Sequence, residues 1–426
     1  MAEHTTTEHT TTEHTTTGTA AVFERHESNV RSYCRSFPAV FERARGQYLW
    51  DEHGTRYTDL LCGAGALNYG HNPPDMVAAV VAYLTGGGPV QSLDLHTRAK
   101  AEFLARFNEV VLAPRGLDDH VLQFPGPAGT LAVEAALKLA RKVTGRSNVI
   151  AFRHGFHGVS LGSLATTSNL LLRGAAGVPL RDVTVLPYDT AGLAQAVTAA
   201  PPAAFILETV QGEGGLHVAS REFLAKLRRV ADSLGALVIV DDIQAGCGRT
   251  GTFFSFDGHP ELRPDLVCLS KSLSGMGLPM AALLIRREYD RWAPGEHNGT
   301  FRGHNLAFVA GTAALARWAD PAFAAHALAL AAAIRSSLAS IVAALPSGTA
   351  EIAGRGAMSG LRFGSAELVD RIRANLFRAN VIAETSGDGR VLKLMPPLTM
   401  SLPDWTAVAE TLGTVVTDAA ALGLAV

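Results

Sequence analysis

The 426-residue sequence is poor in features that would mark several classes of protein. It has four scattered cysteines, at positions 34, 62, 247 and 268, and no CxxC pair. This usage is typical of reduced thiols and argues against a disulfide framework or a metal site. It also lacks an excess of charge, because 37 Lys and Arg residues face 39 Asp and Glu residues, for a net charge of -2. That balance gives no electrostatic reason to expect nucleic acid or an anionic membrane as a partner.

Long apolar runs are missing as well. The Ala-rich run from Ala327 to Ile334 is well short of the ~18 residues expected of a membrane span. The amino terminus has neither the basic region nor the apolar core of a signal peptide, so we expect a cytoplasmic protein. The Pro/Gly turn at residues 125–130 is neither a Walker loop nor a GxGxxG motif, so it does not specifically indicate a nucleotide.

The first residues form a polar repeat. Residues 3–17 are EHTTT three times over. Such a tract cannot bury enough apolar surface to offset its ordering entropy, so residues 1–18 are predicted to be a disordered tail. His4, His9 and His14 recur every five residues, a spacing that fits neither a helix face nor a zinc finger.

Beyond residue 75, helical and strand-like patterns alternate along the chain. The predicted helices are 75–84, 97–110, 130–144 and 220–234. The predicted strands are 148–152, 183–187, 203–207, 237–240 and 266–269. This alternation predicts an α/β fold with a mostly parallel sheet between two layers of helices.

The pattern changes near Pro321 to Ala-rich helices with strand-like runs at 358–362 and 391–394. A hairpin signal with Gly54 at its turn lies near the amino terminus. We expect both chain ends to build a smaller α+β domain beside the large one. The predicted bounds are 1–18 for the tail, 19–75 and 321–426 for the small domain, and 76–320 for the large domain.

Two predicted strands end in residues that suit one cofactor. The run 237–240 ends at Asp241, and the run 266–269 is followed by Ser270 and Lys271. Ligands collect at the carboxyl ends of strands in an open parallel sheet, so Asp241 and Lys271 should face one crevice. Pyridoxal phosphate needs a lysine for its Schiff base and an acid for its ring nitrogen. Taken alone, the pair could equally be a structural ion pair.

Other segments could complete such a site. Gly129 and Thr130 follow a Pro/Gly turn and open a predicted helix, whose amino end could bind a phosphate or could simply be a capped helix. Phe156 could stack on a planar ring or belong to the core, and His157 could orient a cofactor or satisfy the backbone. Glu213 lies among glycines and could pair with a cation or remain solvated.

Together, the runs around Lys271, DDIQAGCGRTG, GTLAVEAALKLAR, FHG and QGEGG resemble the class III aminotransferases of the fold-type-I pyridoxal phosphate family. The resemblance spans about two-thirds of the chain. Further stretches at 26–33, 63–72, 296–303 and 391–399 are similar to the diaminobutyrate–2-oxoglutarate transaminase branch. That branch supplies 2,4-diaminobutyrate for ectoine and for some siderophores and peptides.

The resemblance implies a role for each matching residue. Lys271 would be the catalytic Schiff-base lysine and Asp241 the partner of the ring nitrogen. The other implied cofactor contacts are Gly129 and Thr130 to the phosphate, Phe156 and His157 beside the ring, Gln244 near the phenolic oxygen, and Thr300 to the phosphate of a neighbouring subunit. The last contact implies a homodimer with shared active sites, possibly assembled further. Glu213 would shield a basic residue and swing aside for glutamate.

Three departures from the family pattern concern the substrate. The usual arginine near the carboxyl terminus is Lys393, and a lysine lacks the fork with which arginine grips a carboxylate. Residues 302–306 lack the proline of GGNP, and Leu131 replaces a glutamate. The implied substrates are still an amino acid and a keto acid, with no metal.

The expected reaction is transfer of an amino group from L-glutamate to L-aspartate 4-semialdehyde. The alternatives within the family are an ornithine- or acetylornithine-type aminotransferase and an aminomutase. A nicotinamide-dependent enzyme and a non-catalytic relative are the alternatives of other classes. The first would use the Gly-rich turn at 125–130, which lacks the GxGxxG spacing, and it has no use for Lys271. The second is disfavoured by the intact Lys271, Asp241 and Gln244.

Overall fold

The computed structural model describes residues 18–196 and 200–423. The predicted tail, with His4, His9 and His14, lies outside the described residues except for Gly18.

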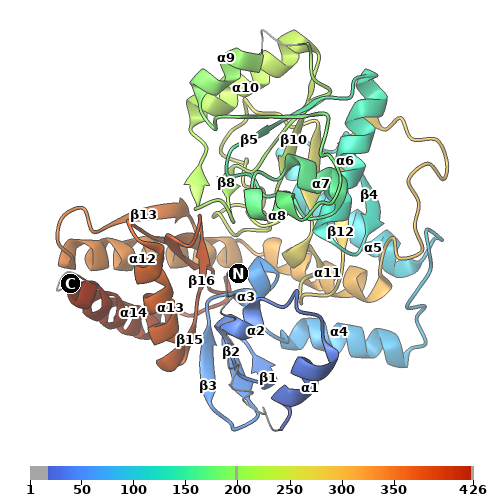
Figure 1. The fold of residues 1–426 in the computed structure, drawn as a ribbon. Coiled ribbons are helices and arrows are strands. Elements are labelled where there is room, and N and C mark those ends of the chain that lie inside the picture. Colours follow the sequence, from blue (N-terminus) through green and yellow to red (C-terminus); the bar gives the residue numbers. More distant parts are fainter. Residues whose placement is uncertain (1–17, 197–199, 424–426) are drawn as a thin grey trace, which may run out of the picture.

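A seven-stranded sheet forms the centre of the molecule (Figure 1), in the order β4-β12-β11-β10-β7-β5-β6. Its strands are β4 (His120–Gly126), β5 (Val149–Phe152), β6 (Val183–Leu186), β7 (Ala204–Leu207), β10 (Leu237–Asp241), β11 (Leu266–Leu269) and β12 (Ala281–Arg286). Strands β11, β10, β7, β5 and β6 pair in parallel, whereas β12 runs antiparallel to β11 and β4. The mostly parallel sheet is therefore confirmed, and β4 and β12 are additions that the sequence reading missed.

Alternating side chains of these strands enter two separate apolar layers. Val238 and Val240 pack on one face, in the cluster that includes residues of α5 (Arg98–Phe107), α10 (Arg221–Leu234) and α11 (Asn305–Trp318). Leu237 and Ile239 pack on the other face, against α6 (Gly129–Thr144). Helices thus cover both faces, as the alternating pattern predicts.

The two ends of the chain share a second sheet. It contains β1 (Phe41–Arg45), β2 (Tyr48–Asp51), β3 (Arg56–Asp59) and β15 (Val381–Ile382). Strands β2 and β3 form the predicted hairpin, with Gly54 at φ +81° in its turn. Strand β15 comes from the carboxyl-terminal part and pairs in parallel with β3.

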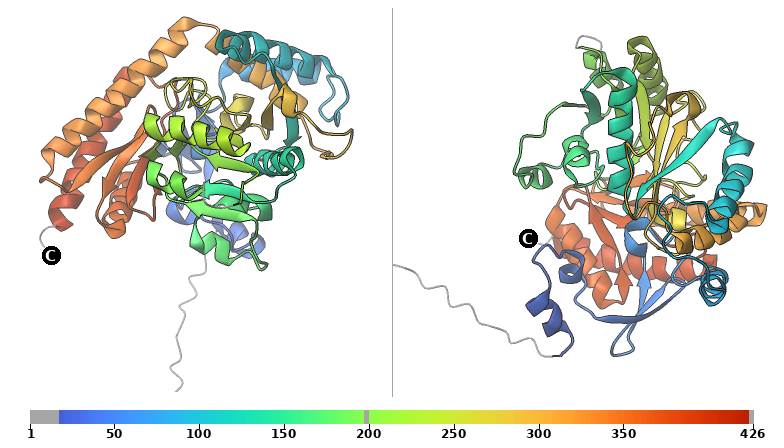
Figure 2. Two further views of the ribbon diagram at one scale, coloured as in Figure 1. Left: turned by 90° about the horizontal axis from the view of Figure 1, so that it is seen from above. Right: turned by 90° about the vertical axis from the view of Figure 1, so that its right-hand side faces the viewer.

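A third sheet lies next to these strands, in the order β13-β14-β17-β16. Its strands are β13 (Ala350–Arg355), β14 (Met358–Phe363), β16 (Glu384–Ser386) and β17 (Val391–Leu394). The helices α12 (Pro321–Ala344), α13 (Ala366–Arg378) and α14 (Leu402–Gly423) contribute to its core. Figure 2 shows these carboxyl-terminal elements in orange and red beside the central sheet.

Among the described residues, α12 has the length and composition of a membrane-crossing helix. However, Leu330, Ile334 and Leu338 of α12 are fully buried in the same apolar cluster as residues of α14. These residues form its buried side, and 28% of its most apolar 18-residue window is buried.

The remaining elements are short connections and outer helices. They include α1 (Ala20–His26), α2 (Tyr33–Ser36), α3 (Cys62–Gly65), α4 (Pro74–Thr85), α7 (Leu161–Thr166), α8 (Leu170–Gly174), α9 (Thr190–Ala196), β8 (Val210–Gln211) and β9 (His217–Val218). Helix α5 continues into a π-helical turn, Asn108–Leu112, and β11 is followed by a 3-10 turn, Lys271–Ser274.

Candidate active site

A cavity of about 250 Å³ opens at the carboxyl ends of the central strands. Asp241 ends β10, and Lys271 lies two residues beyond β11. Both line this one cavity. It is also lined by Ala128, Gly129, Thr130, Phe156, His157, Gly158, Val159, Glu208, Glu213, Ile243, Gln244 and Ser270. The predicted meeting of Asp241 and Lys271 in one crevice is therefore what the structure shows.

Lys271 is held by backbone geometry and one hydrogen bond. Its φ of +50° starts the 3-10 turn after β11, and its Nζ donates to the carbonyl oxygen of Ala64 at 2.8 Å. Ala64 lies in α3, where Gly63 and Ala64 both have left-handed backbone angles. Burial lowers the pKa of the Lys271 amine, although the nearby carboxylate of Glu213 opposes that shift. A lowered pKa makes the neutral amine, which is a base and nucleophile, more accessible.

Asp241 and His157 form a buried pair on another side of the cavity. His157 Nδ1 lies 2.8 Å from Asp241 Oδ2. Burial would lower the pKa of His157, but the hydrogen bond and charge of Asp241 outweigh it and raise the pKa above its ordinary value. The ring of His157 thus contacts Asp241, a partner that the sequence reading did not foresee.

Glu208 directly follows β7, and its carboxylate contacts the backbone of Phe156. Its two carboxylate oxygens accept the backbone N–H groups of Phe156 and Gly212, each at 2.9 Å. Burial raises the pKa of Glu208 to about 7, against the opposing charge of His157. The abrupt end of an apolar run at Glu208 was the available signal, and the hydrogen bonds now give the residue a positioning role.

The amino end of α6 provides an anion site. The preceding residue, Ala128, provides no side-chain cap, and no acidic residue lies in the first turn. The Thr130 Oγ1 lies 2.5 Å from Ser160 Oγ and 2.6 Å from Ser163 Oγ. The backbone N–H groups of an uncapped helix start, with hydroxyl groups beside them, suit a phosphate. Ser160 and Ser163 were not singled out from the sequence.

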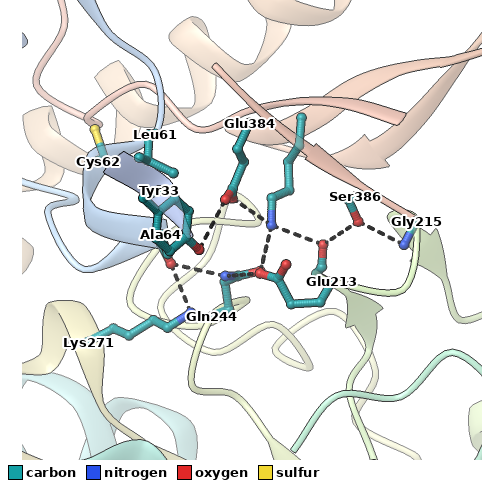
Figure 3. A network of polar contacts seen from close by, with 12 residues as sticks. Tyr33, Leu61, Cys62, Ala64, Glu213, Gly215, Gln244, Lys271, Glu384 and Ser386 are labelled. Carbon is teal, nitrogen blue, oxygen red and sulfur yellow. Dashed lines mark hydrogen bonds and ion pairs between the residues drawn. The ribbon is translucent and has the colours of Figure 1, made fainter. Parts of the chain in front are cut away.

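A buried ionic cluster lies beside the cavity, and Figure 3 shows its residues Glu213, Glu384 and Gln244 close together. The Lys393 Nζ contacts Glu384 Oε1 at 2.7 Å and Glu213 Oε1 at 2.8 Å. It also donates to the carbonyl oxygen of Gly212 at 3.1 Å. Gln244 Nε2 donates to Glu213 Oε1 and to the oxygen of Ala64, both at 3.0 Å. The cluster therefore connects the substrate residues predicted from the sequence to the Lys271 region.

The charged groups in this cluster change one another's pKa values. Burial would raise the pKa of Glu213, but the positive charge of Lys393 lowers it to about 2. Burial and the repulsion of Glu213 raise the pKa of Glu384, although Lys393 opposes this. The two carboxylates in turn raise the pKa of Lys393 despite its burial. Lys393 is therefore an ammonium at neutral pH.

Two residues of the cluster were missed from the sequence. Glu384 is a single carboxylate in the short strand β16, and Tyr33 lies in α2 with its hydroxyl 3.5 Å from Glu384 Oε2. The place of Glu384 directly after the apolar residues 381–383 was a signal, but its pairing with Lys393 depends on a strand register that local sequence does not contain.

Thr300 does not line this cavity. It lies in an exposed loop, where its carbonyl oxygen accepts a hydrogen bond from Gln91 Nε2 at 2.7 Å. Its predicted contact with the phosphate of a neighbouring subunit remains a prediction.

The residues present fit pyridoxal phosphate. The uncapped start of α6 offers an anion site, and half-buried Phe156 lines the same cavity as this helix start and Asp241. Lys271 supplies an amine of lowered pKa on the same cavity, and the Asp241 carboxylate faces it. A phosphate, an aldehyde carbon and a ring nitrogen are the three groups that such residues would hold.

Comparison with known proteins agrees with this assignment. The family model described as "Aminotransferase class-III" matches residues 31–416. A diaminobutyrate–2-oxoglutarate transaminase of Oceanobacillus iheyensis is 48% identical, over 89% of this chain and 92% of its own length. The transaminase of the same name from Vibrio cholerae is 47% identical, over 90% of this chain and 96% of its own length.

A solved structure of similar fold is the ornithine aminotransferase of Toxoplasma gondii. It superposes with a TM-score of 0.83 at 25% identity, covering 94% of this chain and 93% of the other. Fold-type-I architecture is thus common to both chains. The chain belongs to the class III aminotransferase family, and pyridoxal 5′-phosphate is its cofactor.

Proposed function

We propose that this enzyme moves an amino group from L-glutamate to L-aspartate 4-semialdehyde, giving L-2,4-diaminobutyrate and 2-oxoglutarate, in a reversible reaction. The main support is similarity over about nine-tenths of the chain to transaminases of that name. We place the reaction in the cytoplasm. The product would serve ectoine synthesis or the synthesis of siderophores and peptides.

Each residue of the site would have its own role in the reaction. When bound, pyridoxal phosphate supplies an electron-accepting ring that stabilises charge at the reacting carbon. Lys271 Nζ would take the proton from that carbon and deliver it to the aldehyde-derived carbon of the cofactor, which its lowered pKa favours. Asp241, oriented by His157, presents a carboxylate to the ring nitrogen. The start of α6 holds the phosphate.

The ion pair between Glu213 and Lys393 would stay formed with one amino donor and would break with the other. With diaminobutyrate the reacting carbon carries no carboxylate, and Glu213 stays on Lys393. With glutamate the α-carboxylate takes the place of Glu213. Lysine offers that carboxylate a point charge and not the bidentate grip of arginine.

A donor–acceptor screen tests the substrate assignment. We expect 2-oxoglutarate to accept an amino group from diaminobutyrate with kcat/KM at least roughly tenfold higher than from ornithine or acetylornithine, because a misplaced amine loses the near-attack geometry. Consumption of diaminobutyrate is followed by coupled detection of glutamate. Faster turnover of ornithine would favour the ornithine-type alternative, and isomerisation without a keto acid would indicate an aminomutase.

We also propose a homodimer whose active sites are shared through Thr300. Mixing of two variants of low activity tests this. Lys271→Ala removes the amine of one site, and Thr300→Ala weakens phosphate binding in the neighbouring site. In hybrid dimers one site carries both defects and the other carries neither, so activity should return to roughly a quarter of the wild-type value, from random pairing of subunits. Hybrids with no recovered activity would contradict shared sites.

A further inference from the structure

Two carboxylates contact Lys393, and they differ in rigidity. Glu384 lies in β16 directly across from Lys393 in β17, so their backbones are paired in the sheet. The Glu384 side chain is 6% exposed, whereas that of Glu213, in a glycine-rich loop, is 31% exposed. Glu384 is therefore a fixed partner of Lys393, and Glu213 is the one placed to exchange with substrate.

When a substrate carboxylate displaces Glu213, Glu384 is the carboxylate that still balances the Lys393 ammonium. Lys271 does not enter this balance, because its amine carries the cofactor in the holoenzyme. Figure 3 shows Glu213, Glu384 and Lys271 converging from three different parts of the fold. Without Glu384, a substrate would meet a site one unit more positive. The other titratable group facing Glu384 is Tyr33, whose pKa is raised by burial and by Glu384 itself.

We propose that Glu384 is a specificity-determining residue that offsets the charge of Lys393 and thereby favours a diamino acid over a dicarboxylate in this cavity. The proposal rests on the proposed function, because it presumes that one half-reaction takes a cationic diamino acid. Glu384 acts through Lys393 and the field in the cavity, so it is a positioning residue and not a catalytic one.

Coulomb's law gives the direction and scale of the effect. Diaminobutyrate carries net positive charge at neutral pH, and glutamate and 2-oxoglutarate carry net negative charge. A unit charge in a partly buried site acts on a substrate charge several ångströms away strongly enough to change binding by roughly tenfold. Removing the Glu384 charge should therefore weaken the diamino half-reaction and strengthen or spare the glutamate half-reaction.

The test uses Glu384→Gln holoenzyme, in which the amide keeps the size of the side chain without its charge. We expect kcat/KM for diaminobutyrate to fall roughly tenfold, while kcat/KM for glutamate stays the same or rises. Glutarate, a dicarboxylate that cannot react, should bind roughly threefold to tenfold tighter by calorimetry. The control is Glu351→Gln, which removes an exposed carboxylate paired with Arg362 and should change none of the three values.

A purely structural role would weaken both half-reactions and glutarate binding together, and that result would overturn the proposal. If Glu384→Gln does not fold, a Glu208→Gln holoenzyme keeps the test open, because lowering the pH then protonates Glu384 and should tighten glutarate binding without a contribution from Glu208, whose pKa is about 7. Glu213, with its pKa of about 2, stays charged over this range. Glutarate affinity independent of pH would then contradict the proposal. Absence of diaminobutyrate turnover in wild type would refute the proposed function alone, since glutarate binding still reports on Glu384.

Discussion

Replacing Lys271 with alanine should lower turnover by roughly a thousandfold or more, because the variant lacks both the covalent anchor and the proton-transfer base. The Lys271 Nζ is the only described lysine nitrogen lining the cavity. The visible absorbance of the lysine-bound cofactor should disappear with it. Steady-state rates with diaminobutyrate and 2-oxoglutarate, together with absorption spectra, measure both effects.

Lys226→Ala is a matched control. Lys226 Nζ donates to the carbonyl oxygen of Thr190, away from the cavity. This variant should keep wild-type turnover and absorbance. Near wild-type turnover of Lys271→Ala would remove the catalytic assignment, whatever the control does.

Replacing Asp241 with asparagine should lower turnover by roughly a hundredfold to a thousandfold, the scale seen when a preorganised electrostatic partner is removed. The substitution conserves shape but removes the negative charge beside His157. Burial is then opposed only by the more distant charge of Glu208, so the pKa of the His157 imidazole should fall. The pKa is measured by NMR titration of the His157 ring nitrogens, and the rate by the same coupled assay.

The adjacent residue provides the control for Asp241. Asp242 is equally buried, but it accepts the backbone N–H of Ser255 at 3.1 Å and does not line the cavity. We expect Asp242→Asn to keep turnover within a few-fold of wild type. Equal loss of turnover in the two variants would indicate that buried charge near β10 matters for folding and not for the cofactor.

Much of this architecture can be read from local patterns. The strands β5, β7, β10 and β11 are short aliphatic runs bounded by polar residues, and the structure places each within two residues of its predicted limits. The polar residues that end β10 and follow β11 meet in one cavity because parallel strands present their carboxyl ends together. The domain bounds and the individual roles in the site remain predictions.

Other features depend on contacts between distant segments. Strand β12 is an aliphatic run like the others, but its antiparallel direction follows from its pairings with β11 and β4. The contact of His157 with Asp241 joins residues 84 positions apart. Glu384 meets Lys393 through the register of β16 and β17. No local pattern specifies such pairings, so these residues had no assigned partner before the structure.

The most direct test of the account is to find the lysine that carries the cofactor. Borohydride reduction of the holoenzyme fixes pyridoxal phosphate covalently on its lysine, and peptide mapping by mass spectrometry then locates it. The account predicts the label on Lys271, in the peptide that follows β11. A label on any other lysine, or none on the purified active enzyme, would contradict it.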